Sequence, residues 1–159
     1  MCTGVRFADA AGNLYFGRNL DWCESYGEGV VITPRGASIP SQFLGSLSPE
    51  HACVGMGIVV GGVPCYFDCA NEAGLAIAGL NFPGYAQFAE APEKGAVNVA
   101  AYEFPLWVAA SFSTVAEVRK ALKDVVIVAK APSEGYGVAQ LHWLVGDGKE
   151  SIVIECQAE

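Results

Sequence analysis

Two long stretches of the sequence carry no charged residue, and glycine and proline interrupt both. They cover residues 52–67 and 73–89, which are sixteen and seventeen residues long. Both are shorter than the roughly 20 apolar residues that a helix needs to cross a bilayer. Their glycines and prolines also disfavour a continuous helix. The pattern predicts buried β-strands joined by tight turns, and it argues against a membrane as a partner.

Alternation of apolar and other residues predicts an N-terminal β-hairpin. Residues 3–8 alternate in this way, residues 10–13 (Ala-Ala-Gly-Asn) are typical of a turn, and residues 14–19 are expected to form the returning strand. Further strands are expected over residues 29–33, 53–60, 65–70, 75–81, 125–129, 141–145 and 151–156. The last two flank a Gly-Asp-Gly turn, so we expect them to pair as another hairpin.

Two helices are expected between these groups of strands. Pro105 suits the first turn of one helix, because a backbone N–H there has no helical partner in any case. Thr114 and Glu117 have the spacing of a capping box, in which each side chain accepts a hydrogen bond from an otherwise unpaired N–H at the start of the next helix. Strands, two helices and strands again predict an α+β fold. We expect one domain over residues 1–159, with the helices packed on a largely antiparallel sheet.

The composition excludes several classes of protein. Hydrophobic residues make up 52% of the chain and charged residues 16%, which is the reverse of a disordered chain. The net charge is −8 and no basic stretch is present, so no nucleic acid partner is expected. The first residues contain neither the basic nor the apolar segment of a secretion signal, which predicts a cytoplasmic location.

The cysteines favour a chain without structural disulfides or a metal site. The six are Cys2, Cys23, Cys53, Cys65, Cys69 and Cys156. Disulfides are rare in a reducing cytosol, and the spacing of Cys65 and Cys69 is not that of a usual zinc site. With only two histidines in the chain, we expect no metal and no cofactor. Most of these cysteines are expected to be small buried apolar residues.

Cys2 is different, because removal of the initiator Met1 would place its thiol and the chain's free α-amine on one residue. The reference pKa values of a thiol, about 8.5, and of an α-amine, about 7.7–8.0, let either group exchange a proton near neutral pH. The amine can therefore act as the base for its own nucleophile, with no histidine needed. The alternative is that Cys2 is an incidental residue at the chain terminus.

Three further residues are candidates for the same site. The predicted hairpin brings Arg18 and Asp21 back beside the N-terminus, where Arg18 can favour a thiolate and Asp21 can orient the α-ammonium. A bend is required for both to reach one place, because residues three apart on a strand face opposite sides; a surface ion pair is the alternative. Asn81 ends an apolar strand and can donate N–H groups to an oxyanion, or it can simply begin a turn.

Several motifs together resemble the choloylglycine hydrolase family, which contains bile salt hydrolases and penicillin V acylases of the N-terminal nucleophile (Ntn) superfamily. They run in order along the whole chain. They are residues 1–4 (Met-Cys-Thr-Gly), 16–21 (Phe-Gly-Arg-Asn-Leu-Asp), 71–75 (Asn-Glu-Ala-Gly-Leu), 78–84 (Ala-Gly-Leu-Asn-Phe-Pro-Gly), 104–108 (Phe-Pro-Leu-Trp-Val), 141–143 (Leu-His-Trp) and 146–153 (Gly-Asp-Gly-Lys-Glu-Ser-Ile-Val). The family's members are about twice as long, so the resemblance covers their N-terminal half.

The resemblance implies a four-layer αββα sandwich with helices on its outer faces, here truncated. It implies an amidohydrolase with Cys2 as the nucleophile, Arg18 and Asp21 around it, and Asn81 in the oxyanion role. An Asn at position 81 favours conjugated bile salts as the substrate, with penicillin V acylase activity or an inactive fragment as alternatives. The segments that line the family's steroid pocket contain Leu20, Trp22, Tyr26, Val60 and Phe67, each of which is equally plausible as a core residue. The full-length family also implies a homo-oligomer, a tetramer.

Overall fold

The computed structural model describes residues 2–157, and within them it contains twelve strands and two helices. The elements are β1 (Thr3–Ala8), β2 (Leu14–Asn19), β3 (Gly29–Thr33), β4 (Ile39–Ser41), β5 (Gly45–Leu47), β6 (Cys53–Val60), β7 (Val63–Asn71), β8 (Ala76–Asn81), β9 (Val97–Ala100), α1 (Phe104–Ser111), α2 (Val115–Ala121), β10 (Val125–Val128), β11 (Leu141–Gly146) and β12 (Ser151–Ile154). The α+β class predicted from the sequence is confirmed.

A six-stranded sheet organises the molecule, with the strand order β12-β11-β8-β7-β6-β3. Every neighbouring pair in it is antiparallel. The two charge-free stretches supply its centre: β6 and β7 pair across a Gly61-Gly62 turn, and β8 continues the meander. The predicted hairpin of β11 and β12 forms one edge. Glycine and proline in the apolar stretches therefore mark turns between buried strands, as the sequence predicts.

Strand β7 contains a β-bulge that decides which way its side chains face. The register with β6 shifts between Met56 and Gly57, which leaves Phe67 as an extra residue on β7. This extra residue allows Tyr66 and Cys69, three positions apart, to lie in the same hydrophobic core. Because successive side chains on a strand point to opposite faces, Asp68 lies on the other face from Cys69.

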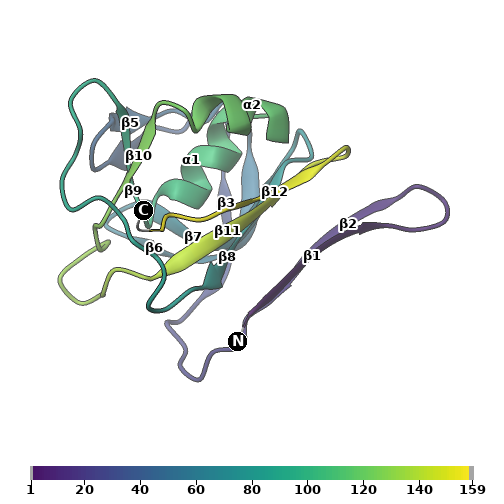
Figure 1. The fold of residues 1–159 in the computed structure, drawn as a ribbon, viewed down its shortest axis with the longest axis horizontal. Helices are drawn as coiled ribbons and strands as arrows, with labels where there is room; N and C mark the ends of the chain where they lie inside the picture. The colour runs from purple at the N-terminus through teal and green to yellow at the C-terminus, as the bar shows by residue number, and fades with distance from the viewer. Residues whose placement is uncertain (1, 158–159) are drawn as a thin grey trace.

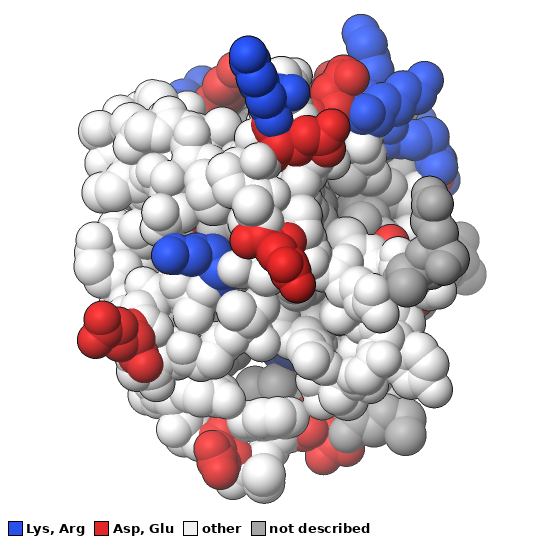
Figure 2. Space-filling model, turned by 60° about the vertical axis from the view of Figure 1, so that its left-hand side comes forward, with Lys and Arg blue, Asp and Glu red and all other residues white. Residues whose placement is uncertain are grey.

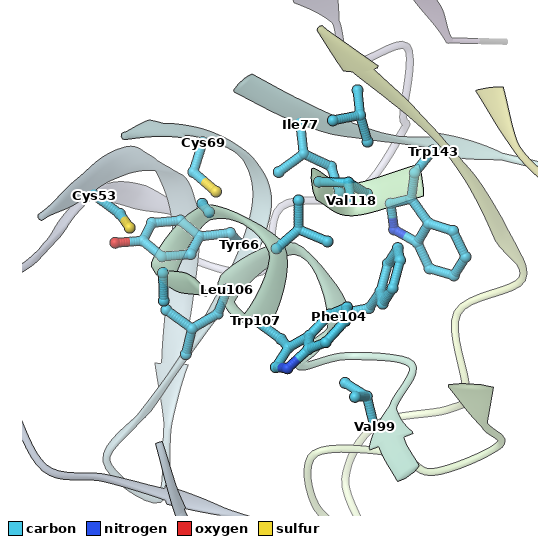
Figure 3. Close-up of a cluster of buried hydrophobic side chains, with 14 of the residues drawn as sticks. Cys53, Tyr66, Cys69, Ile77, Val99, Phe104, Leu106, Trp107, Val118 and Trp143 are labelled. Carbon is cyan, nitrogen blue, oxygen red and sulfur yellow. The ribbon is translucent and has the colours of Figure 1, made fainter. Parts of the chain in front are cut away.

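Both helices lie on one face of the six-stranded sheet (Figure 1). Seven of the eight residues of α1 are buried, as expected for a helix that is apolar all round. Figure 3 shows Trp143, Ile77 and Val118 packed with α1 in this core. Helix α2 begins with the predicted capping box of Thr114 and Glu117, and the Asp147 carboxylate accepts a hydrogen bond of 2.7 Å from the Val115 backbone N–H.

The hairpin of β1 and β2 packs on the opposite face of the sheet and extends away from the helices (Figure 1). Gly4 lies so close to this face that a Cβ atom there would come within 3.0 Å of the Leu144 side chain. The Arg6 Nε donates a hydrogen bond of 2.9 Å to the Asp147 carbonyl oxygen. The hairpin is therefore attached at its open end, which positions the first residues of the chain.

Three strands were not anticipated from the sequence. Strands β4 and β5 form a short hairpin, and β9 pairs in parallel with β10 outside the main sheet. Strand β10 was expected, but its partner β9 follows a stretch rich in Pro, Glu and Gly that gave no strand pattern. Among the described residues no helix is long and apolar enough to span a membrane. Figure 2 shows one face of the molecule, on which uncharged residues predominate.

Candidate active site

A cavity of about 530 Å³ lies beside the first residues of the chain. Its volume is in the range of about 300–1,000 Å³ that is typical of pockets for organic ligands. Three of the predicted catalytic residues line it, namely Cys2, Arg18 and Asn81. They come from the residue before β1, from β2 and from the end of β8, so the fold brings together residues that are up to 79 positions apart in the sequence.

Arg18 places a buried positive charge next to the Cys2 thiol. Its Nη2 lies 4.0 Å from the Cys2 Sγ, and its Nη1 lies 3.4 Å from Asp68 Oδ2. The Arg18 side chain is 6% exposed, so solvent screens its charge weakly. Arg18 does not form the surface ion pair with Asp21 that was the alternative, because the carboxylate that it contacts is that of Asp68.

The surroundings of Cys2 favour its thiolate. Burial raises the pKa of the Cys2 thiol, but hydrogen bonds from the backbones of Asn81 and Asp21 and the charge of Arg18 lower it. The lowering contributions win, so the pKa lies below the ordinary value. A thiolate is the nucleophilic form of cysteine, so this thiol is chemically distinct from an ordinary exposed one.

The other cysteines in the sheet have the opposite character. Burial raises the pKa of Cys53 to about 11 and that of Cys65 to about 12, and it raises the pKa of Cys69 well above its ordinary value. All six cysteines are free. Among the described residues, no group of three or more His, Cys, Asp or Glu side chains is arranged to hold a metal ion.

Asn81 is the last residue of β8, where the strand passes into a turn, and its role as an oxyanion donor stays a prediction. It pairs with Leu141 across the sheet, and its backbone contributes to the lowered pKa of Cys2. The turn that follows is fastened by Gln140, whose backbone carbonyl accepts from Phe82 N at 2.8 Å and whose Oε1 accepts from Gly84 N at 2.7 Å. Strand pairing and turn together give Asn81 a defined position at the cavity wall.

Asp21 lies beyond the end of β2, which supplies the bend that its spacing from Arg18 requires. Its backbone reaches the Cys2 thiol, although the residue is not among those that line the cavity. Its predicted contact is with the α-amine that removal of Met1 would create, and Met1 lies outside the described residues. The role of the Asp21 carboxylate therefore stays a prediction.

Aromatic and aliphatic side chains form much of the cavity wall. Four of the five predicted pocket residues are part of it, namely Leu20, Trp22, Tyr26 and Phe67. The Trp22 Nε1 donates a hydrogen bond of 3.0 Å to the Tyr26 hydroxyl, and the Tyr26 and Phe67 rings meet edge to face at 6.0 Å. Val60 is not a lining residue; Ile58, two positions earlier on β6, lines the cavity instead.

The segment before β11 was missed as part of the site. Lys130, Pro132 and residues 135–140 all line the cavity, and the Tyr136 ring lies 6.3 Å from that of Tyr26. No motif in this Gly- and Pro-containing segment indicates a ligand. Ile58 could have been predicted together with Val60, because residues two apart on a strand point to the same face.

The chain is similar to known proteins over almost its whole length. Residues 2–159 match the family described as linear amide C–N hydrolases, choloylglycine hydrolase family. The chain is 53% identical over 155 residues to a conjugated bile acid hydrolase of Lactobacillus gasseri, and the matched region covers 98% of this chain and 49% of that protein. It is 54% identical over 160 residues to a bile salt hydrolase/transferase of Bifidobacterium longum subsp. longum, covering 100% of this chain and 50% of that protein. The chain thus spans about half the length of the curated relatives it matches.

Solved structures show the same relationship in three dimensions. A mutant conjugated bile acid hydrolase from Clostridium perfringens superimposes with a TM-score of 0.93 at 36% identity, over 99% of this chain and 48% of that one. Penicillin V acylase from Agrobacterium tumefaciens superimposes with a TM-score of 0.72 at 20% identity, over 98% of this chain and 46% of that one. The second likeness concerns the fold alone.

Proposed function

The chain belongs to the choloylglycine hydrolase family of linear amide C–N hydrolases, and from that premise we propose that it hydrolyses the amide bond of glycine- or taurine-conjugated bile salts. The single observation that carries the proposal is the position of the Cys2 thiol. It lies in an apolar cavity, beside a buried guanidinium, with its pKa lowered. A nucleophile, a charge that stabilises its reactive form and a ligand-sized cavity occur together.

The reaction that we propose begins after removal of Met1. The α-amine of Cys2 takes the thiol proton, and Sγ forms a bond to the amide carbonyl carbon. Asn81 donates to the resulting oxyanion, the C–N bond breaks, and the amine leaves with the proton from the α-ammonium. The acyl group is then held as a thioester on Cys2. Water adds to the thioester under the same base, the C–S bond breaks, and the acid and the free thiol are released.

The cavity wall supports an acyl group that is large and apolar. Leu20, Trp22, Tyr26 and Phe67 provide apolar surface in the same cavity as Cys2. Burial of such surface is favourable in proportion to its area, which suits the fused rings of a bile acid. Asp21 is proposed to orient the α-ammonium, where its backbone already lies next to the thiol.

Hydrolysis of penicillin V by the same steps is the second candidate, because it needs only a different acyl group in the same cavity. The test compares turnover of taurocholate, glycocholate and penicillin V by this chain and by a version extended to the length of its relatives. Mass spectrometry first verifies that Met1 has been removed. Faster turnover of the bile salts supports the proposal, and preferential turnover of penicillin V replaces it. A processed chain that turns over none of the three, while the extended protein does, identifies this chain as an inactive fragment.

Two further properties are proposed from the family and from the surface. A homo-oligomer is supported by apolar side chains left exposed on the hairpin, including Val5, Phe7 and Tyr15. A cytoplasmic location is supported by six free thiols, which suit a reducing compartment. Light scattering after gel filtration tests the first, and fractionation of the producing cells tests the second.

A further inference from the structure

The Arg18 guanidinium is held between a group on the residue before β1 and a group on β7. One of its terminal nitrogens, Nη2, lies 4.0 Å from Cys2 Sγ, while the other, Nη1, lies 3.4 Å from Asp68 Oδ2. The planar guanidinium is a rigid fork, so fixing one end restricts where the other can lie. The Nε atom is buried and has no hydrogen-bond partner among the described residues. The position of Arg18 therefore depends on its two terminal nitrogens.

Asp68 is well suited to act as the fixed end. It lies on β7, with β6 and β8 hydrogen-bonded on either side, and it pairs with Met56 on one and Ala78 on the other. The bulge at Phe67 directs Tyr66 and Cys69 into the helix side, which leaves Asp68 on the face that meets the hairpin. The Met56 backbone also donates to its carboxylate. A central strand is thus the support, whereas Cys2 is the first residue that the structure describes.

Space is available for Arg18 to move if this anchor is lost. A second cavity of about 210 Å³ lies between the hairpin and the sheet, and both Arg18 and Asp68 line it. Its other lining includes Phe16, Val54 and Ala76, which offer no charged partner. Arg18 also lines the larger cavity that holds Cys2. Without Asp68, the guanidinium can turn away from the thiol into this second space.

We infer that Asp68 is a positioning residue: its carboxylate holds one end of the Arg18 fork so that the other end stays against the Cys2 thiolate. The inference rests on the proposed function, since it assigns Asp68 a task at that site. Burial raises the pKa of the Asp68 carboxyl, against the lowering effect of the Arg18 charge. Its surroundings thus disfavour an unpaired carboxylate, and Arg18 is the cation that compensates for it. Asp68 is 29% exposed and does not line the larger cavity, so it acts on Cys2 through Arg18.

The test follows the pH dependence of alkylation of Cys2, a measurement that needs no substrate. Iodoacetamide is added to the processed chain between pH 5 and 10, and the rate at Cys2 is obtained by peptide mass spectrometry, which separates it from the other five thiols. The titratable groups around Cys2 are its own α-amine, Asp21 and, in the larger cavity, the side chains of Arg18, Tyr26, Cys65, Tyr66, Tyr102, Lys130 and Tyr136. None of them is altered except Arg18, so they form a constant background.

Two variants change the anchor: Asp68→Ala removes it, and Asp68→Asn keeps its size and one acceptor oxygen. The other two are Arg18→Leu and the double variant Asp68→Ala/Arg18→Leu. Asp68→Ala is expected to move the midpoint of the profile up by about one pH unit, an approximately tenfold loss of thiolate below the midpoint. Asp68→Asn is expected to move it less. Asp124→Asn, which removes the same charge at a residue outside both cavities, is the control and should leave the profile unchanged.

The double variant separates positioning from a general effect on the fold. If Asp68 acts through Arg18, adding Asp68→Ala to Arg18→Leu changes the midpoint no further. An unchanged or lower midpoint in Asp68→Ala, or an equal shift in both backgrounds, overturns the inference. If Arg18→Leu leaves the midpoint in place, Arg18 does not stabilise the Cys2 thiolate, and that part of the proposed function is wrong too. If only the Asp68 variants fail to shift the midpoint, the inference about Asp68 is wrong but the proposed function is unaffected. Should Asp68→Ala not fold by circular dichroism, Asp68→Asn carries the same comparison.

Discussion

The two faces of the six-stranded sheet differ in almost every physical property. The face under α1 and α2 is closed, and side chains such as Ile77, Trp143 and Val145 are fully buried there. The face that meets the hairpin is partly open: Val30 is 72% exposed and Ile32 is 69% exposed. Apolar residues thus occur on both faces, but only one of them is sealed by other parts of the described chain.

Charge and reactivity follow the same division. The helix face holds Cys69, whose burial raises its pKa and keeps it as a thiol. The face toward the hairpin holds Asp68 and Arg18, and the Arg18 guanidinium extends to Cys2. The difference teaches that the buried core and the Arg18–Asp68 pair lie on opposite faces of one sheet, with the bulge at Phe67 as the point where β7 contributes to both. The cavity that holds Cys2 is also lined by Tyr66 and Pro105 from the helix side.

The largest expected effect concerns the chemistry. Cys2→Ser replaces the thiol by a hydroxyl that is far less acidic, so hydrolysis of taurocholate should fall by on the order of 10³-fold or more, with the unfolding temperature unchanged. Turnover is measured in whichever form of the protein, this chain or its extended version, proves active. Cys23→Ser, at an exposed thiol, is the matched control and should retain full activity. Substantial turnover by Cys2→Ser contradicts the proposed mechanism.

The next prediction compares the stability of the two faces directly. Trp143→Ala removes a fully buried side chain from the closed face and should lower the free energy of unfolding by about 3–5 kcal/mol. Val30→Ala on the open face should change it by no more than about 0.5 kcal/mol. Urea denaturation of both variants provides the measurement. Similar losses in the two variants show that something covers the open face in solution.

The third prediction uses the buried thiols and alkaline pH. The folded protein raises the pKa of Cys53 to about 11 and of Cys65 to about 12, from an ordinary value of 9.0. Both thiols therefore favour folding at pH values below 9, where they are protonated in either state. As the pH rises from 9 toward 12, the unfolded chain ionises first and this contribution is lost.

The expected result is a fall in the free energy of unfolding, on the order of a few kcal/mol, between pH 8 and 11. Urea denaturation at a series of pH values measures it. Cys53→Ala should flatten the slope, while Cys2→Ala should not, because the pKa of Cys2 is shifted in the other direction. A slope that is the same in both variants means that other groups cause the loss.

Local patterns in the sequence predicted most of the fold. Alternation and turn residues located the hairpin of β1 and β2, and the meander of β6, β7 and β8. The capping box predicted the start of α2 from Thr114 and Glu117 alone. These succeed because hydrogen bonding and burial within a short segment determine them. Strand β9 was missed because its parallel partner, β10, lies 25 or more residues away and no local pattern encodes that pairing.

The candidate site was predicted only in part, because local patterns do not show which distant segments meet in the fold. Cys2 was singled out by its position after Met1, and Arg18 and Asn81 by their places near strand ends together with the family resemblance; the fold brings all three to one cavity. Lys130 and Tyr136 were missed because nothing in their segment shows that it folds over the cavity. Asp68 was missed because the face of the sheet on which it lies depends on Phe67, the unpaired residue of the β7 bulge. A shift of register by one residue moves every side chain beyond it to the opposite face.

The smallest predicted effect tests how the closed face is assembled. Thr114→Ala removes the hydroxyl that accepts from the Glu117 backbone N–H at 3.2 Å, so it should lower the free energy of unfolding by about 1 kcal/mol. Thermal or urea denaturation measures this against Lys123→Ala, which lies beyond the helix and should have less effect. Helix α2 contributes the fully buried Val115 and Val118 to the core against the sheet. Fraying of its first turn should therefore loosen the closed face, while the alkylation profile of Cys2 on the other side stays the same; a change in that profile would show that the two faces are coupled.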